Sequence, residues 1–387
     1  MFKTIKDLEV DGKTILLRVD FNVPFDAVGR VLDDFRLQAA WPTVQYLLAR
    51  RCKIVLLSHF SEDAGFGQGA PLNPEKMALL VGRLFGQPLR LAPEISGPAV
   101  GAAVAGLKEG EMILLPNLRD DPGEKQNDQT FAHKLAKLGD VFINDAFSVC
   151  HRAHASVATL PTLLPSAAGL LVQKEVAALQ QVGQKIASAT LVLGGAKIST
   201  KISLIGKFLN EAQNVLVGGA LANNLLEFEG VAVGQSLVEK NLTPGLVEKI
   251  DIQSPKLHLP VDALVADDTA GKNIQTKTIA NIETAQLILD IGPETTTLFT
   301  DIIKKAAVVV WNGPLGFFEN ESFFGGTRQV AQAVARAPFS VIGGGETILC
   351  ARQAAGLGKF THVSTGGGAM MDFLAGEKLP GLAVLGL

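Results

Sequence analysis

Short runs of apolar, mostly β-branched residues recur along the chain, and amphipathic segments such as RLQAAWPTVQYLLARR lie between many of them. Continuous apolar runs alternating with amphipathic helices are typical of buried parallel strands in β-α-β units. The runs are KTILLRVDF, KIVLLSHF, EMILLPN and VFINDAF in the first half, and TLVLGGA, NVLVGGA, VDALVAD, LILDIGP, AAVVVWNGP, FSVIGGG and THVSTGGG in the second. The pattern predicts a doubly wound α/β protein in which these runs are parallel strands.

The length of 387 residues suits about two domains rather than one core. A long helix-like segment, SAAGLLVQKEVAALQQVGQKIASA, lies near the middle of the chain. We therefore expect two Rossmann-like lobes, each a parallel sheet covered by helices, joined by a hinge helix. The expected boundaries are 1–168 for the N-terminal lobe, 169–187 for the interdomain helix and 188–370 for the C-terminal lobe, with the tail 371–387 packing back near the N-terminal lobe.

The amino-acid composition limits which classes of molecule the protein is expected to bind. Charged residues make up 19% of the chain and the formal net charge is −3, so neither a nucleic-acid nor a membrane-surface footprint is indicated. The three cysteines form no CxxC pair, and the opening MFKTIKDLEVDGK lacks the apolar core of a signal peptide. No apolar stretch is long enough for a membrane span. We expect a cytoplasmic protein that binds small molecules.

The apolar runs of the first half end in polar clusters. In open parallel sheets, ligands bind beyond the carboxyl ends of the strands, so these side chains are candidates for a binding site. They are Asp20, Asn22, His59, Asn117, Arg119, Asn144, Asp145, His151 and Arg152. Together with Arg36, the arginines could clamp a phosphate and a carboxylate, because a guanidinium fork matches both. Surface arginines more often have no such role.

The segment INDAFSVCHRAHAS concentrates several reactive residue types after one strand. Its side chains leave two other chemistries open. One is a Ser/His/Asp nucleophile, although no nucleophile elbow is present. The other is a metal site at His151 and His154, although no third ligand follows at a suitable spacing.

The apolar runs of the second half end in glycine-rich clusters. GGAKISTK (194–201) places Lys197 and Lys201 four residues apart, which predicts one shared helix face near bound phosphate. GGGET (343–347) could cradle phosphates with its backbone while Glu346 reaches Mg²⁺. STGGGA (364–369) and WNGPLGFFE (311–319) occupy similar positions. Neither a Walker A nor a GxGxxG sequence is present, and each cluster alone also fits a tight βα turn.

Taken in order, these segments resemble the phosphoglycerate kinase family along nearly the whole chain. The matching stretches are LLRVDFNVP, DDFRLQAAWPTVQYLL, NLRDDPGE, VFINDAF, HRAHAS, GGAKISTK, LDIGPETTTLF, VVWNGPLGFFE, SVIGGGET and HVSTGGGAMMDFL. The resemblance implies phosphoglycerate on the first lobe and Mg²⁺ with ATP or ADP on the second. It implies reversible phosphoryl transfer between 1,3-bisphosphoglycerate and ADP in glycolysis, giving 3-phosphoglycerate and ATP, by a monomer that closes about a hinge.

The resemblance also implies roles for individual residues. Substrate binding falls to Asp20, Asn22, Arg36, His59, Arg119 and Arg152. Nucleotide binding falls to Lys197, Lys201, Asn312, Glu319, Gly343, Gly344, Gly345, Glu346 and Thr347, with Glu346 also on the metal. Arg36, Lys197 and Lys201 are the expected catalytic residues, because in-line phosphoryl transfer depends on positioning and charge stabilisation rather than on a protein nucleophile.

The chain departs from the family pattern mainly in its first half. SHFSED stands in place of SHLGRP, so Glu62 replaces an arginine. Two acids, Asp120 and Asp121, follow NLR, and the family's GTA before HRAHAS becomes Ser148, Val149 and Cys150. In the second half, Glu346 replaces an aspartate and Ala220 a glycine.

These departures leave three alternatives. One is a relative with an altered acceptor or low activity, and another is a binding scaffold without chemistry. The third is an NAD-dependent oxidoreductase, which would carry GxGxxG after its first strand, where this chain has DFNVP instead.

Glu62 gives a first prediction. An acid in place of a cation repels an anionic substrate, so the affinity for 3-phosphoglycerate is expected to be weak for the family. Glu62→Arg should lower the KM for 3-phosphoglycerate in steady-state kinetics. An unchanged KM would refute the repulsion.

Overall fold

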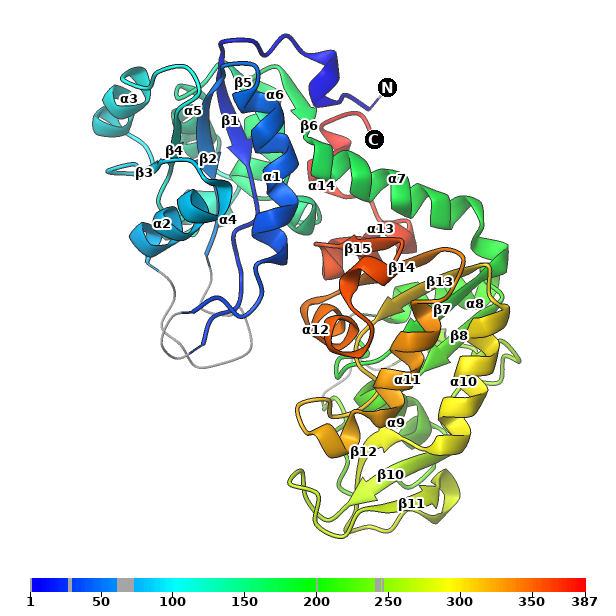
Figure 1. The fold of residues 1–387 in the computed structure, drawn as a ribbon. Helices are drawn as coiled ribbons and strands as arrows, with labels where there is room; N and C mark the ends of the chain where they lie inside the picture. Colours follow the sequence, from blue (N-terminus) through cyan, green and yellow to red (C-terminus); the bar gives the residue numbers. More distant parts are fainter. Residues whose placement is uncertain (1, 27–29, 61–72, 200, 241–244, 246) are drawn as a thin grey trace. The chain divides into compact units, whose positions relative to one another are not determined.

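The fold comes from a computed structural model that describes residues 2–26, 30–60, 73–199, 201–240, 245 and 247–387 (Figure 1). Glu62 lies outside the described residues. The chain forms two compact units. Unit 1 comprises Met1–Ala177 with Lys378–Leu387, and unit 2 comprises Ala178–Glu377. The two units are described separately below.

Unit 1 is built on a six-stranded parallel sheet in the order β3-β4-β2-β1-β5-β6. Its strands are β1 (Thr14–Arg18), β2 (Lys53–Leu57), β3 (Leu89–Leu91), β4 (Met112–Leu114), β5 (Val141–Asn144) and β6 (Ser166–Ala168). Its helices are α1 (Phe35–Leu48), α2 (Pro74–Phe85), α3 (Pro98–Ala105), α4 (Pro122–Lys125), α5 (Gln129–Ala136), α6 (Leu160–Leu163) and α14 (Pro380–Ala383). The predicted strands of the first half are all present and parallel.

Both faces of the central strands are buried, which explains why these strands are mostly apolar rather than alternating. Leu17 and Leu56 face a core that α1 and α2 complete. Their neighbours Leu16 and Val55 face the opposite core, which α3, α5 and α6 complete. Successive side chains of a strand point to opposite faces, so helices on both sides bury all but the first position of β1 and β2.

Unit 2 has a second six-stranded parallel sheet, in the order β15-β14-β13-β7-β8-β9. Its strands are β7 (Ala189–Leu193), β8 (Asn214–Val217), β9 (Leu257–His258), β13 (Val308–Asn312), β14 (Ser340–Gly343) and β15 (His362–Ser364). Its helices are α8 (Ile202–Glu211), α9 (Gly219–Phe228), α10 (Pro293–Lys305), α11 (Gly325–Val334), α12 (Gly345–Ala354) and α13 (Gly367–Ala375). The buried Trp311 of β13 lies in the core that α10, α11 and α12 share with this sheet.

Two of the predicted parallel strands of the second half are instead antiparallel. VDALVAD and LILDIGP form β10 (Asp262–Ala266) and β12 (Leu287–Ile291). They belong to a separate sheet in which β10 pairs with β12 on one side and with β11 (Gln275–Thr278) on the other. A parallel pair needs a crossover, usually a helix, whereas an antiparallel pair does not. The chain between these two runs forms β11 and a 3₁₀ turn but no α-helix, so it returns antiparallel. The α/β fold class is confirmed, with this small sheet added.

The segment predicted as one long helix forms two elements. Residues 166–168 are strand β6, and helix α7 (Leu170–Gln184) begins two residues later. The Asp145 carboxylate accepts the Leu171 N–H at 2.9 Å and thereby caps the first turn of α7. The division between the two units falls within α7.

Short turns complete the described structure. They are η1 (Ile5–Asp7), η2 (Leu118–Asp120), η3 (Phe147–Val149), η4 (Ala155–Thr159), η5 (Ile186–Ser188), η6 (Val247–Lys249), η7 (Ile279–Asn281), η8 (Glu321–Phe323) and η9 (Leu357–Lys359). Among the described residues, no helix is both long and apolar enough to cross a membrane.

The start of α10 gives a stability prediction. The buried carboxylate of Asp262 accepts the N–H groups of Glu294 (3.0 Å) and Thr295 (2.8 Å) and the Thr295 hydroxyl (2.6 Å). Asp262→Ala leaves these donors unsatisfied and should cost about 2 kcal/mol, which lowers the thermal midpoint of unit 2 by roughly 4–8 °C in calorimetry.

Asp301→Ala is the matched control on the same helix. Asp301 makes an exposed ion pair with Lys304 at the surface, so its loss should leave the midpoint unchanged. Equal midpoints for Asp262→Ala and the wild type would contradict the capping role.

Candidate functional site

The polar clusters of unit 1 follow four adjacent strands. Asp20 and Asn22 follow β1, His59 follows β2, Arg119 follows β4, and the segment with Arg152 follows β5. These strands lie in the order β4-β2-β1-β5 and are all parallel, so their carboxyl ends meet at one edge of the sheet. Because of that arrangement, side chains up to about 130 residues apart in sequence come together.

Asp20 is the centre of this cluster and is only 4% exposed. Its Oδ2 lies 3.2 Å from Arg36 Nη1 and accepts the Ser148 hydroxyl at 2.5 Å, while Oδ1 accepts the Asn22 N–H at 3.0 Å. Burial alone would raise the pKa of Asp20, but the charge of Arg36 and the hydrogen bonds from the Ser148 hydroxyl and the Asn22 N–H lower it. Asp20 is therefore an ionised acceptor in a cationic setting. Arg36 is further fixed by donating to the Asn22 carbonyl at 2.7 Å.

Arg18, the last residue of β1, sets the state of His59. The Arg18 side chain is fully buried, and its Nη2 lies 3.3 Å from His59 Nδ1. A guanidinium can only donate, so Nδ1 must accept and the His59 proton sits on Nε2. Burial, aided by the neighbouring guanidinium groups, holds the pKa of His59 well below its ordinary value. His59 is thus a neutral ring with one N–H donor.

Arg119 and Arg152 add positive charge to the same edge. Burial lowers the pKa of Arg119, and the charges of Arg152 and Arg18 lower it further. The buried Nε of Arg119 has no hydrogen-bond partner among the described residues. A buried donor between like charges favours a bound anion, because an anion would satisfy the donor and reduce the repulsion.

The two acids after Arg119 have local partners. Asp121 accepts the Gly123 N–H at 2.8 Å and caps α4, and Asp120 accepts from Asn117 Nδ2 at 2.9 Å. The possible metal site at His151 and His154 is not supported, because no group of three metal-ligating side chains occurs among the described residues.

The glycine-rich clusters of unit 2 also follow four adjacent strands. GGAKISTK follows β7, WNGPLGFFE contains the end of β13, GGGET the end of β14 and STGGGA the end of β15. The strands lie in the order β15-β14-β13-β7, all parallel, so the clusters meet at one edge of this sheet.

The prediction that Lys197 and Lys201 share a helix face is wrong. Helix α8 begins only at Ile202, and the preceding residues form a loop in which Gly195 has a φ of +86°. Lys197 is exposed, whereas Lys201 is 7% exposed and donates to the Gly194 carbonyl. Burial lowers the pKa of Lys201 to about 8, and the opposite charge of Glu346 partly offsets that effect. Lys201 is therefore the buried cation of the loop, and its pKa is lower than that of an ordinary lysine.

Asn312, Gly344 and Thr347 hold the ends of β13 and β14 together. Asn312 Nδ2 donates to the Gly343 carbonyl at 2.6 Å, and the Thr347 hydroxyl accepts the Gly313 N–H at 2.7 Å. Gly344 has a φ of +102°, and a Cβ there would lie 2.9 Å from Asn312 Nδ2. Glycine is required at this position, since another residue would be both strained and crowded.

A cavity of about 420 Å³ lies at this edge of unit 2. Its walls are largely apolar, and the two predicted acids, Glu319 and Glu346, both line it. Ala220 also lines it. Burial and then the charge of Glu319 raise the pKa of Glu346, while Lys201 lowers it. The remaining lining is Gly195, Ala196, Gly219, Gln235, Leu237, Thr269, Leu287, Ile288, Leu289, Asp290, Pro314, Leu315, Gly316, Phe317 and Phe318.

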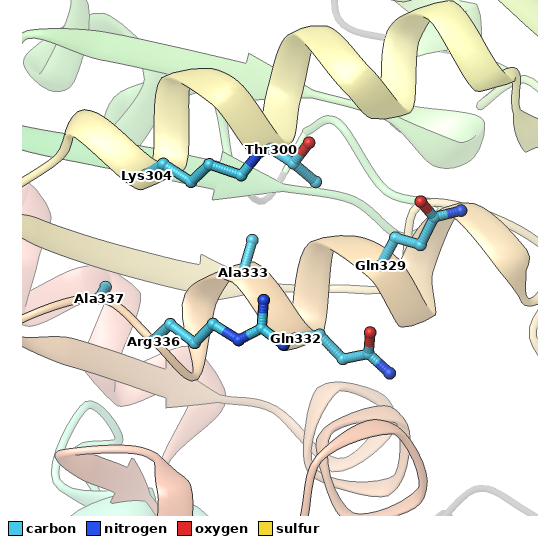
Figure 2. Close-up of a pocket in the computed structure, with 7 residues that line it drawn as sticks. All are labelled: Thr300, Lys304, Gln329, Gln332, Ala333, Arg336 and Ala337. Carbon is cyan, nitrogen blue, oxygen red and sulfur yellow. The ribbon is translucent and has the colours of Figure 1, made fainter.

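A second hollow of about 260 Å³ lies between α10 and α11 (Figure 2). Lys304 of α10 and Arg336, which follows the end of α11, line it together with Gln329 and Gln332. None of the predicted site residues lines it, and Lys304 is already paired with Asp301 at 2.8 Å. This hollow is therefore not part of the candidate site.

The sequence analysis missed Arg18 and the contact of Ser148 with Asp20. Arg18 Nε donates to the Ser156 hydroxyl at 3.0 Å, and that hydroxyl donates to buried Glu124 at 2.6 Å. The sequence could have indicated Arg18, because it is a charged residue in the apolar run TILLR. A charged side chain on a buried strand needs hydrogen-bonding or oppositely charged partners. The contact of Ser148 with Asp20 spans 128 residues, and no local pattern indicates it.

Unit 1 carries a cluster of cations that suits a bound anion, and unit 2 carries glycine-rich loops and a lysine beside a cavity. Together these features define a phosphotransferase. Comparison with known proteins identifies its family. The family model for phosphoglycerate kinase matches residues 5–377, and the chain belongs to that family. The predicted family is thereby confirmed, and the oxidoreductase alternative is wrong.

Similar proteins cover the chain almost completely. The phosphoglycerate kinase of Pelotomaculum thermopropionicum is 41% identical over 99% of this chain and 98% of the relative, and that of Moorella thermoacetica matches equally well. The crystal structure of the Pyrococcus horikoshii enzyme superposes with a TM-score of 0.87 at 32% identity, covering 100% of this chain and 98% of that one. The structure of the Coxiella burnetii enzyme gives a TM-score of 0.82 at 32% identity, covering 100% and 99%.

The environment of Lys201 gives a testable prediction. With ¹³Cε-labelled lysine, one NMR resonance should titrate near pH 8, and Lys201→Arg should remove it. Glu346→Gln removes the charge that raises the Lys201 pKa, so the midpoint should fall further. If the Lys201 midpoint in the wild type stays near the ordinary lysine value, burial does not lower the pKa of Lys201 and this description of its environment is wrong.

Proposed function

We propose that the protein catalyses reversible, Mg²⁺-dependent phosphoryl transfer between 1,3-bisphosphoglycerate and ADP, giving 3-phosphoglycerate and ATP. The observation that carries the proposal is the convergence of Asp20, His59, Arg36 and Arg119 at one edge of unit 1. There the cations outnumber the acids that face them. Such a surplus suits a small ligand with both a phosphate and a carboxylate.

In unit 1, we assign binding of the phosphoglycerate to this cluster. Arg119 and Arg152 supply donors for the anionic groups, and neutral His59 offers its Nε2–H. Asp20 accepts the glycerate hydroxyl, because an ionised carboxylate is an acceptor only. Asn22 orients both Asp20 and Arg36 through its backbone. Arg36 lies beside Asp20 and is the candidate to stabilise the carboxyl end where the phosphoryl group is attached.

In unit 2, we assign the nucleotide to the cavity and to the glycine-rich loops beside it. The apolar wall formed by Leu289, Phe317 and Phe318 suits a nucleobase, and exposed Glu319 suits the ribose hydroxyls. The start of α12 at Gly345, with Gly343 and Gly344 before it, presents backbone N–H groups and the positive end of the helix dipole to phosphates.

Lys201 and Lys197 are the proposed cations for the nucleotide phosphates. Lys201 donates to the Gly194 carbonyl, so a phosphate oxygen would compete for a donor that is already buried and weakly solvated. Such preorganised charge stabilises the three equatorial oxygens of the transferring group without needing to reorganise. No protein nucleophile is required.

The carboxylates of Glu346 and Glu319 fit a Mg²⁺ ion in chemical type, because Mg²⁺ prefers oxygen ligands. They interact electrostatically with each other and line the same cavity. Asp290 also lines this cavity, but its carboxylate accepts the N–H groups of Ile291 and Gly326. With two acids left for an ion, Mg²⁺ would share the phosphate oxygens of the nucleotide, as is usual for Mg²⁺ sites. Glu346 is the proposed protein ligand, and the ion would offset negative charge on the phosphates.

We further propose that the enzyme acts as a cytoplasmic monomer. Cys52, Cys150 and Cys350 are all buried and unpaired, which fits a reducing compartment.

A coupled assay tests the activity. With 3-phosphoglycerate and MgATP, the wild type should form ADP, and Lys201→Met should lower kcat by about 10²–10³-fold. Lys304→Met, in the unrelated hollow of Figure 2, is the matched control and should keep the wild-type rate. A wild type without activity would favour a divergent relative with another acceptor, and a fully active Lys201→Met would remove Lys201 from the mechanism.

A further inference from the structure

Ser148 lies on the turn η3 after β5 and contacts the centre of the anion site. Its hydroxyl donates to Asp20 Oδ2 at 2.5 Å, across 128 residues of sequence. The side chain is half-buried, and the two flanking residues, Phe147 and Val149, are buried in the protein interior. The position of the hydroxyl is therefore set by the packing of the turn.

The contacts of Asp20 show what the hydroxyl does. Each carboxylate oxygen has two lone pairs. On Oδ2, one is directed to Arg36 Nη1 at 3.2 Å and the other to Ser148. On Oδ1, the Asn22 N–H takes one at 3.0 Å. His59 Nδ1 lies 4.0 Å from Oδ1 and accepts from Arg18, so it does not donate to Asp20. Oδ1 is thus the oxygen with capacity for a further donor.

We propose that Ser148 is a positioning residue that saturates Oδ2 of Asp20 and so directs the substrate hydroxyl to Oδ1. The proposal rests on the proposed function, in which Asp20 accepts the hydroxyl of 3-phosphoglycerate. Without Ser148, the carboxylate can rotate about its Cβ–Cγ bond and Oδ2 competes with Oδ1 for the ligand. Preorganisation of this kind improves binding because less freedom is lost when the ligand arrives.

Ser148 is not a nucleophile in this arrangement. Its proton lies on a hydrogen bond to a carboxylate whose pKa is lowered, and such a carboxylate is a weak base. The ring of His59 is engaged with Arg18 through Nδ1. The Ser/His/Asp alternative therefore lacks the base that it would need, and the role of Ser148 is to orient Asp20.

Comparing the binding of two ligands distinguishes this positioning role from a purely structural one. The first is 3-phosphoglycerate, and the second is 3-phosphonooxypropanoate, which lacks the C2 hydroxyl but keeps the phosphate and the carboxylate. Ser148→Ala should raise the KM for 3-phosphoglycerate about five- to tenfold, the upper part of the range for one ordinary hydrogen bond. The inhibition constant of 3-phosphonooxypropanoate should stay unchanged, and kcat should remain within about twofold.

Conservative replacement and a matched control complete the experiment. Ser148→Thr retains the hydroxyl and should restore the KM. Ser166→Ala removes a hydroxyl that donates to the Leu164 carbonyl at 2.8 Å at the start of β6, and it should change neither constant.

Each other outcome overturns the inference. If Ser148→Ala weakens both ligands equally, the residue has a merely structural role, and if it weakens neither, Ser148 does not position Asp20. A wild type that fails to phosphorylate 3-phosphoglycerate would overturn the proposed function as well, whereas an active wild type with an unaffected variant would overturn only the role of Ser148.

Discussion

Parallel pairing of the central strands is the constraint on which both halves of the candidate site depend. In unit 1, Arg18 at the end of β1 is level with Leu57 of β2 and with Asn144 of β5. In unit 2, Asn312 at the end of β13 is level with Leu193 of β7. Strands paired in this way leave the sheet at the same edge, so the residues that follow them must share one small region. The chemistry of the site therefore depends on which residues follow these strands.

In the proposed function, the two units bind negative ligands by different physical means. Unit 1 uses buried side-chain cations, and buried charges need partners of opposite charge within the protein. Arg18 is paired through Ser156 with Glu124, and Asp20 faces Arg36, so the desolvated charges have partners while Arg119 keeps a donor for a ligand. Unit 2 uses backbone N–H groups at helix starts and one buried lysine, which suits a ligand that lies against glycines.

Much of this fold follows from sequence pattern, because burial on both faces makes parallel strands uniformly apolar. The antiparallel pairing of β10 and β12 was not predicted, since their runs look like the others and only the lack of an intervening α-helix distinguishes them. The candidate site was predictable where glycines and arginines follow strands. The shared face of Lys197 and Lys201 was not, because helix α8 begins only at Ile202, after both lysines. The contact of Ser148 with Asp20 depends on tertiary structure alone.

The central claim is that each unit holds one of the two ligands at the carboxyl edge of its own sheet. Hydrogen–deuterium exchange of the intact chain, with 3-phosphoglycerate and MgADP added separately, tests it most directly. 3-Phosphoglycerate should slow exchange in the segments after β1, β4 and β5, and MgADP in those after β7, β13 and β14. Protection of the unit 2 loops by 3-phosphoglycerate, or of the unit 1 loops by MgADP, would contradict the account.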